Sequence, residues 1–200
     1  MAAAAQTLGL ALAGSVATAS EVDRTTLEGC RRRDPAALKR FVLHHQRQVF
    51  GFLSRMLGRG PHVEDLAQEV FVRTYQALPG FDPEGAAKVS TWVLGIAARV
   101  AIDWRRKARR TLVALEDAGA IAGGVSPEDE AHRFELARAF EAAASGLDDD
   151  QRTVFVLAEF HGLTMAEMAQ SLGIPENTVK TRLFRAREKM RALLEGMREA

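Results

Sequence analysis

The sequence predicts an all-α protein of two small helical domains joined by a flexible acidic linker, with a helix-turn-helix in the second domain. Long stretches rich in Ala, Leu, Glu and Arg favour helices, and runs of β-branched residues are few. From Thr25 onward, apolar residues recur at helical spacing. Segment 112–125 is rich in Ala and Gly and interrupts that spacing, which is typical of a linker.

The composition excludes several classes of protein. An apolar content of 47% is far above that of a disordered chain. Cys30 is the single cysteine, so a disulfide framework within the chain and a zinc site with two or more of its cysteines are both excluded. One thiol suits a reducing compartment, and we interpret it as a structural residue, with a redox role as the alternative.

Charge is distributed in blocks along the chain. Residues 24–110 contain 17 Lys and Arg against 8 Asp and Glu, residues 111–160 contain 3 against 11, and residues 161–200 contain 7 against 5. With Glu21 and Asp23, these blocks give the net charge: 9 − 8 + 2 − 2 = +1. Two basic segments therefore flank an acidic middle, and the segments are expected to meet different partners.

The first domain is expected to contain three helices. The first spans 35–57, because Asp34 is a good N-cap before Pro35 and the glycines at 58 and 60 end the apolar pattern. The second spans 62–78 and ends at Pro79-Gly80, and a loop covers 81–89. Ser90 is expected to cap a third helix over 91–110.

Four further helices are predicted over 127–145, 148–161, 164–172 and 175–197. The domain limits that follow are a flexible tail over 1–23, a first domain over 24–110, a linker over 111–126 and a second domain over 127–197.

The N-terminal segment allows two interpretations. Residues 2–20 carry no charge, and Ala17-Thr18-Ala19 resembles the cleavage site of a secretory signal. Against an export signal, no Lys or Arg precedes the apolar run, and Gly, Ser, Thr and Gln dilute it. We favour a flexible tail and expect no stable membrane insertion.

Segment 163–180 has the pattern of a helix-turn-helix. Thr164 and Glu167 stand at the two positions of a capping box, and Gly173 suits the left-handed turn between the helices. Pro175 suits the start of the second helix because it needs no backbone donor there. Ile174 and Val179 are expected to join the two helices.

The second of these helices is expected to bind DNA. One stripe is apolar and predicted to be buried: Val179, Leu183, Ala186 and Met190. Six cations and one acid lie between Lys180 and Arg191, and an α-helix fits the major groove, where such side chains reach bases and phosphates. The alternative is a solvated basic face. The predicted DNA-binding residues are Asn177, Thr178, Lys180, Thr181, Arg182, Phe184, Arg185 and Arg187.

The outer face of helix 62–78 is predicted to bind another protein. An apolar Val72 stands beside Asp65, Gln68 and Glu69, so an apolar centre is combined with charge that selects a partner. The inner face is expected to hold Leu66, Ala67, Val70, Phe71, Thr74 and Ala77. Two alternatives are a solvated acidic face and a metal site at Asp65 and Glu69, which lacks a third ligand.

Helix 91–110 carries an aromatic and arginine-rich side that suits unpaired bases. It comprises Trp92, Gly95, Arg99, Asp103 and Arg106, and the helix ends in the basic run 105–110. Trp92 as a core residue is the alternative. The inner stripe is expected to be Val93, Ala97, Val100, Ala101 and Trp104.

Two motifs give the chain a family resemblance. The first is Glu64-Asp65-Leu66-Ala67-Gln68-Glu69-Val70-Phe71, followed by Phe81-Asp82-Pro83 and Thr91-Trp92-Val93-Leu94-Gly95-Ile96-Ala97. The second runs from Leu163-Thr164 through Gly173-Ile174-Pro175 to Lys189. In this order, over about residues 24–196, the chain resembles an extracytoplasmic-function (ECF) sigma factor of bacterial RNA polymerase.

The resemblance implies a set of partners. The first domain would dock on the β′ clamp of core RNA polymerase through Asp65, Gln68, Glu69 and Val72, and the linker would approach the active-site cleft or RNA exit path, beside the β subunit. Helix 175–190 would lie in the major groove of the −35 element. Binding of the opened −10 element would involve the loop 79–90 and the third helix, with candidates Phe81, Asp82, Lys88, Ser90, Trp92, Arg99 and Arg106.

The same resemblance implies a cytoplasmic factor without catalysis, cofactor or metal, whose partners are polymerase, promoter DNA and an anti-sigma factor. Family members commonly carry an Arg-Asn pair where this chain has Ala98-Arg99, so details of −10 recognition are expected to differ. A stand-alone helix-turn-helix regulator is the alternative function, but it leaves the face around Val72 and the Trp92 side unexplained. The five histidines show no catalytic or metal-ligand spacing that favours an enzyme.

Overall fold

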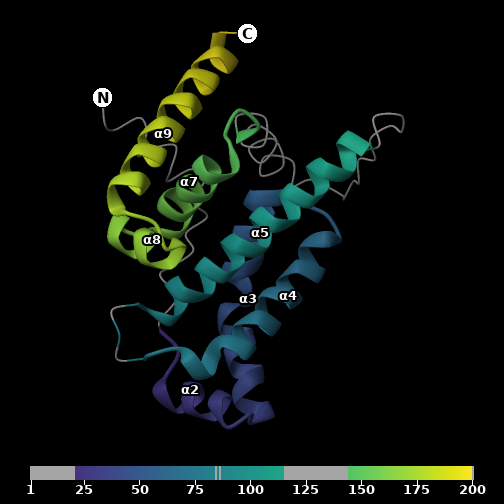
Figure 1. The fold of residues 1–200 in the computed structure, drawn as a ribbon, viewed down its shortest axis with the longest axis vertical. Coiled ribbons are helices and arrows are strands. Elements are labelled where there is room, and N and C mark those ends of the chain that lie inside the picture. Colours follow the sequence, from purple (N-terminus) through teal and green to yellow (C-terminus); the bar gives the residue numbers. More distant parts are fainter. Residues whose placement is uncertain (1–20, 84, 86, 115–143, 200) are drawn as a thin grey trace.

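The computed structural model describes residues 21–83, 85, 87–114 and 144–199, and every regular element in those ranges is helical (Figure 1). The predicted all-α class is therefore confirmed. The tail over 1–20, most of the predicted linker and the predicted helix up to residue 143 lie outside the described residues.

The N-terminal group of helices surrounds α3 (Pro35–Leu57). This helix packs against α2 (Arg24–Arg31), α4 (His62–Ala77) and α5 (Val89–Ala114), and the short 3-10 turn η1 (Leu78–Gly80) follows α4. Phe41, Val49, Phe52, Leu53 and Met56 of α3 are buried at the spacing of one helix face. Burial of this apolar face is what holds the group together.

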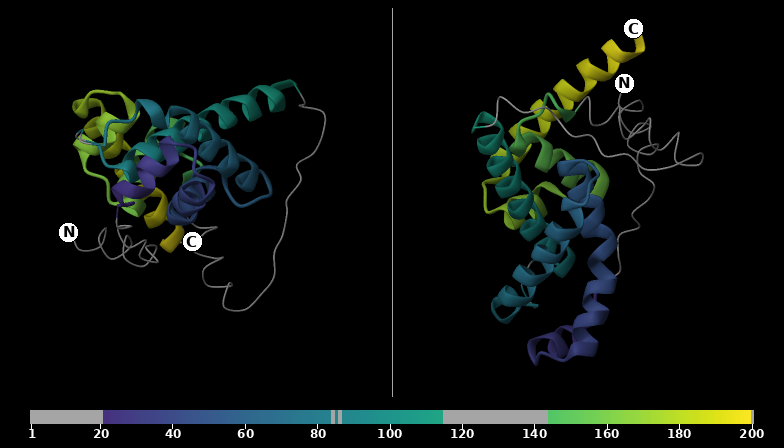
Figure 2. Two further views of the ribbon diagram at one scale, coloured as in Figure 1. Left: turned by 90° about the horizontal axis from the view of Figure 1, so that it is seen from below. Right: turned by 90° about the vertical axis from the view of Figure 1, so that its right-hand side faces the viewer.

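The C-terminal group contains α7 (Asp149–His161), α8 (Met165–Leu172) and α9 (Glu176–Glu199). Both α7 and α8 pack on α9, whose predicted apolar stripe is buried as expected: Val179, Leu183, Ala186 and Met190. The two groups lie against each other, α7 on α3 and α8 on α5 (Figures 1 and 2). Their buried residues form one continuous core.

Several predicted helix ends are confirmed by their hydrogen bonds. The Asp34 carboxylate accepts from the Ala36 amide at 3.0 Å, directly before α3. At the start of α8, the Thr164 hydroxyl accepts from the Glu167 amide and the Glu167 carboxylate accepts from the Thr164 amide. Gly173 adopts the left-handed conformation, with φ 70° and ψ 36°, and turns the chain from α8 into α9.

The start of α5 differs from the prediction. Helix α5 begins at Val89, so Ser90 lies inside the helix and does not cap it. The Glu21 carboxylate accepts hydrogen bonds from the Val89 amide and the Ser90 hydroxyl and thus serves as the cap. The sequence analysis did not predict α2 as a helix of its own. Asp23 caps it, because its carboxylate accepts a hydrogen bond from the Thr26 amide at 2.7 Å.

Three other expectations are corrected. Glu21 and Asp23, placed in the tail, contact the N-terminal helices through the bonds just described. Helix α5 continues to Ala114 and so includes the first residues of the predicted linker, because nothing before Ala114 breaks its helical pattern. Ala77, expected on the inner face of α4, is exposed, because the chain passes into η1 and Leu78 is buried in its place.

Candidate nucleic-acid interface

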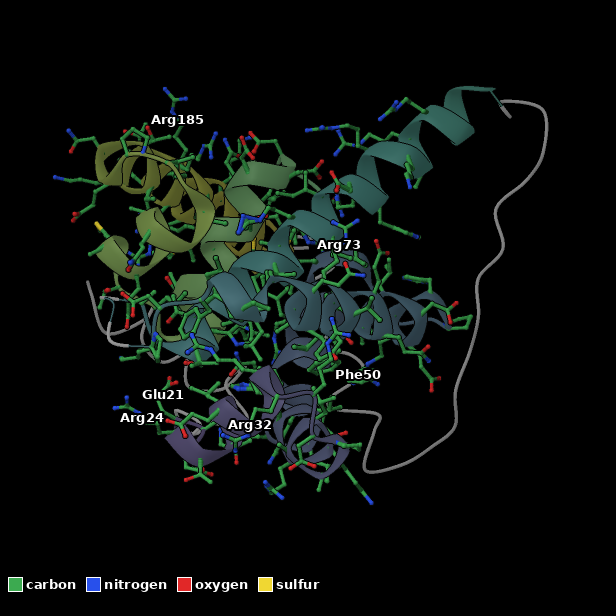
Figure 3. All side chains as sticks on the ribbon, turned by 60° about the horizontal axis from the view of Figure 1, so that its bottom comes forward. Glu21, Arg24, Arg32, Phe50, Arg73 and Arg185 are labelled. Atoms are coloured by element: carbon green, nitrogen blue, oxygen red, sulfur yellow. The ribbon has the colours of Figure 1, made fainter. Side chains whose placement is uncertain are left out.

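Helix α9 presents an exposed polar arc on the side opposite its buried stripe. The arc includes one apolar side chain, Phe184, which is 65% exposed, and Arg185 projects outward from the protein (Figure 3). Asn177, Lys180 and Thr181 are also exposed on α9, whereas Thr178 is half-buried. The turn at Gly173 and the packing of α8 on α9 fix the arc relative to the rest of the C-terminal group. Such an arc has the chemistry to contact base edges in a major groove.

Two cations on the sides of this arc are already paired with acids of α7. The guanidinium of Arg182 lies 2.6 Å from the Asp150 carboxylate, and that of Arg187 lies 2.7 Å from the Glu159 carboxylate. The sequence analysis did not anticipate these pairs, because the partners are about thirty residues apart along the chain. Contact of either arginine with a DNA phosphate requires an exchange of one anion for another.

The outer face of α4 is exposed, as predicted. Val72 is 54% exposed, and Asp65 and Gln68 lie beside it on the solvent side. Glu69 is half-exposed and pairs with Arg73 one turn along α4, and Arg73 also lies 3.6 Å from Asp103 of α5 (Figure 3). Asp65 therefore forms no ion pair with another described residue, whereas Glu69 is partly neutralised by Arg73. Among the described residues, no group of three His, Cys, Asp or Glu has the arrangement of a metal site.

The ring of Trp92 packs against the ring of Phe81. Their ring centroids lie 4.7 Å apart with a 34° angle between the ring planes, and Phe81 is only 7% exposed. The Phe81 carbonyl accepts a hydrogen bond from Arg31 of α2. The buried Phe81 ring is thus not available to a nucleotide in this conformation, contrary to its assignment as a DNA contact, whereas Trp92 is half-buried.

Helix α8 covers the middle of the predicted base-binding side of α5. Gly95 lies so close to α8 that a Cβ atom there would be 2.5 Å from the Ser171 carbonyl oxygen. The Arg99 guanidinium points to the same carbonyl at 3.4 Å. The candidate residues on either side, Asp82 and Arg106, are exposed.

Lys88 and Glu167 form the edge of this contact. The Lys88 ammonium lies 2.9 Å from the Glu167 carboxylate of α8. The hydrogen bond from the Thr164 amide, followed by that from Lys88, holds the pKa of Glu167 below its usual range. Glu167 therefore caps its own helix and binds the N-terminal group at the same time.

Sequence reasoning did not anticipate four side chains that join the two groups. Arg105 and Arg109 of α5 both pair with Asp149 of α7. Arg152, which is only 2% exposed, donates two hydrogen bonds to the Arg55 carbonyl, at 2.9 and 2.6 Å. The one available signal was that Arg152 precedes the buried Val156 and Phe160 of α7 at intervals of four residues and so shares their helix face, where a guanidinium needs partners.

Comparison with known proteins decides the family. The model of Sigma-70 region 2 matches residues 41–111, and that of Sigma-70, region 4 matches residues 137–190. The chain is 34% identical over 177 residues to the ECF RNA polymerase sigma factor SigW of Bacillus subtilis (strain 168), covering 84% of this chain and 94% of the relative. The chain belongs to the ECF sigma factors. The resemblance found in the sequence is thereby confirmed.

Other sigma factors extend this similarity. The RNA polymerase sigma-H factor of Pseudomonas aeruginosa is 32% identical, with 90% of this chain and 98% of the relative covered. The solved structure of CnrH in complex with the cytosolic domain of CnrY is 27% identical, with a TM-score of 0.62, over 87% of this chain and 97% of that chain. The sigma factor RpoE, solved with the anti-sigma factor NepR from Bartonella quintana, shares the fold at 20% identity and a TM-score of 0.64, over 78% and 96% of the two chains.

As an ECF sigma factor, the protein is an alternative factor for transcription initiation whose partners are core RNA polymerase and promoter DNA. The N-terminal group corresponds to region 2 and the C-terminal group to region 4. None of the helices within the described ranges is long and apolar enough to cross a membrane.

Proposed function

We propose that region 4 of this sigma factor binds the −35 element through α9 and that region 2 docks on polymerase and holds the opened −10 element. The observation that supports this most is the exposed arc of α9, with Phe184 65% exposed and Arg185 beside it on the second helix of a helix-turn-helix. The second helix of a helix-turn-helix is the element that enters the major groove, and exposed basic side chains on it suit contacts to DNA.

In region 4, the residues of α9 divide into two kinds. Asn177, Thr181 and Arg185 stand on the exposed arc and are proposed to contact base edges, together with Thr178, Lys180 and Phe184. Arg182 and Arg187 stand at its sides, each paired with an acid of α7, and are proposed to contact phosphates once those pairs open. Base contacts determine sequence preference, and phosphate contacts determine position and salt dependence.

In region 2, Trp92 and the arginines of α5 are proposed to hold the unpaired strand. Trp92 has the firm support of Phe81, so one of its faces can stack on a base without loss of its packing below. Arg99 and Arg106 supply donors along the side of α5 that carries Trp92. The other candidates lie at the start of the helix: Asp82 and Lys88 precede it, and the Ser90 hydroxyl, in its first turn, donates to Glu21. The role assigned to Phe81 is accordingly the support of Trp92.

The outer face of α4 is proposed to bind the β′ clamp, with Val72 at the centre and Asp65, Gln68 and Glu69 around it. The polymerase performs the chemistry, and this chain performs none. It acts in the cytoplasm with its polymerase. An anti-sigma factor is proposed as a further partner, because the solved structures of two similar sigma factors are complexes with CnrY and with NepR.

Arg185→Ala is expected to reduce affinity for the preferred −35 element by about 1–3 kcal/mol and to relax the preference at one base pair. The reason is loss of a guanidinium that can bind guanine through two hydrogen bonds. Arg187→Ala is the matched control: it should weaken all −35 variants alike and reduce the slope of affinity against salt by about one. Affinity is measured across single-base variants at several salt concentrations. Equal loss for every variant in Arg185→Ala would show that Arg185 does not contact a base.

Trp92→Ala is expected to impair promoter opening more than closed-complex binding, with a loss of about 1–3 kcal/mol from one base stack. The stack forms only after the duplex opens. Permanganate footprinting of the holoenzyme on duplex and pre-melted promoters measures this directly.

The matched control for Trp92→Ala is Trp104→Ala. Trp104 is also half-buried on α5, and its ring stacks on His62 with centroids 4.6 Å apart. If Trp104→Ala impairs promoter opening as much as Trp92→Ala does, and both defects match the loss of thermal stability, then Trp92 has a packing role only.

A further inference from the structure

The cations of α9 are not equally free to meet DNA. Of the six between Lys180 and Arg191, four contact acceptors of the chain itself. The other two, Lys180 and Arg185, form no ion pair with another described residue, and both stand on the exposed arc (Figure 3 labels Arg185). Positive charge is therefore free on the arc and engaged beside it.

Two of the four engaged cations are held by carboxylates of α7, which packs on α9. The Arg182 guanidinium lies 2.6 Å from the exposed Asp150. Nε and Nη2 of Arg187 lie 2.8 and 2.7 Å from one oxygen of the half-buried Glu159. A carboxylate offers an arginine the same charged oxygen acceptors as a DNA phosphate, so each pair occupies a guanidinium that would bind the DNA backbone.

The other two engaged cations keep their charge or lie farther along α9. Lys189 donates to the Gly146 carbonyl and to the side-chain oxygen of Gln151, and neither acceptor carries a charge. Arg191 pairs with Glu188 of α9 itself. Within the described part of α9, the two arginines that are proposed to contact phosphates are therefore the two that α7 neutralises.

We propose that Asp150 and Glu159 of α7 act as positioning residues that reduce the affinity of region 4 for DNA, because each holds its arginine until a phosphate takes its place. Exposed ion pairs stabilise by little, so the two acids lower the affinity without blocking it. Phosphate contacts carry no sequence information, and the reduction is therefore the same for every −35 sequence. The factor is thus kept from accumulating on unrelated DNA, whereas contacts of polymerase add to those of α9 at a promoter. This inference rests on the proposed contact of α9 with the −35 element.

Glu159→Gln and Asp150→Asn test the role of the two acids, because each substitution keeps the shape of the side chain and removes its charge. Fluorescence anisotropy measures the affinity of the full-length chain for a −35 duplex selected from a randomised library and for an unrelated duplex of equal length. Each variant should bind both duplexes about threefold more tightly, and the double variant about tenfold. Glu28→Gln is the matched control: Glu28 pairs with Arg24 on α2, well away from α9, and its affinity should not change (Figures 1 and 2).

The Arg187→Ala background separates the holding of an arginine from simple repulsion between an acid and DNA. Glu159→Gln should lose most of its effect in that background, since no guanidinium remains to be released. An equal gain in affinity with and without Arg187 would overturn the inference, as would unchanged or weaker binding by Glu159→Gln alone. In each of these cases a loss of affinity in Arg187→Ala still supports the phosphate contact. If Arg187→Ala itself leaves the DNA affinity unchanged, both the proposed contact and the role of Glu159 are wrong.

Discussion

Asp65→Lys is expected to weaken binding of the sigma factor to core RNA polymerase by about 2–5 kcal/mol, if its partner charge is desolvated in the complex. The substitution places a cation beside the exposed Val72, at an acid that forms no ion pair with another described residue. The partner's cation would then be left buried opposite a like charge. Affinity for purified core polymerase is measured by competition with the unsubstituted factor.

Glu28→Lys provides the control for charge. Glu28 is exposed on α2 and pairs with Arg24. Its replacement by Lys changes the net charge as much as Asp65→Lys does, but on a different surface. Its affinity for polymerase should stay near that of the parent. If a folded Asp65→Lys protein binds as tightly as Glu28→Lys, the outer face of α4 is not part of the polymerase interface.

Acid is expected to destabilise the fold through two histidines, His45, which is fully buried, and His161, which is largely enclosed. Burial, followed by the charge of His44, lowers the pKa of His45 to about 4; burial, followed by the charge of Arg55, lowers that of His161 to about 3. Both nitrogens of His45 and Nε2 of His161 are buried without a hydrogen-bond partner within the described residues. Phe41 packs against His45 and Phe52 against His161, and neither can stabilise a buried imidazolium with a negative charge.

The direction of the pH dependence follows from proton uptake. A histidine in the unfolded chain takes up a proton near pH 6.5, whereas His45 and His161 in the folded protein stay neutral to lower pH. Between pH 6.5 and 4 the unfolded state therefore binds more protons than the folded state. Their contribution to stability is fully present above about pH 6.5 and is lost as the pH falls toward 4. For His45 alone the loss is about 3 kcal/mol, and His161 acts in the same direction.

Urea denaturation at pH 7, 5.5 and 4.5 measures this effect. His45→Leu keeps an apolar side chain of similar size and removes the titrating group, so its unfolding free energy should fall less steeply with acid. The substitution also removes two unpaired buried nitrogens and should raise stability at pH 5.5. A His45→Leu protein with the pH slope of the parent would show that His45 does not resist protonation.

The local structure was predictable from sequence because its signals are local. The cap at Asp34, the capping box of Thr164 and Glu167 and the turn at Gly173 each depend on residues within a few positions of one another. The buried stripe and exposed arc of α9 follow from the helical period alone. These features sufficed to predict the helix-turn-helix and its exposed candidates.

The remaining features depend on contacts between distant segments. Two contacts join residues more than seventy positions apart: the ion pair of Lys88 with Glu167 and the packing of Ser171 against Gly95. No periodicity or spacing in the sequence encodes them. The same holds for Glu21, which the sequence analysis assigned to a tail. Its carboxylate accepts a hydrogen bond from the amide of Val89, 68 residues further along the chain. Burial of Phe81 beneath Trp92 likewise depends on how the loop returns to α5.

Transcription by purified core RNA polymerase over a library of randomised promoters tests the central claim most directly. Addition of this chain is expected to start transcription from a subset of templates that share two separated elements, and the −35 preference should relax at one position with Arg185→Ala. No transcription above that of core polymerase alone, together with sequence-specific DNA binding by the isolated chain, would contradict the account and favour a stand-alone helix-turn-helix regulator.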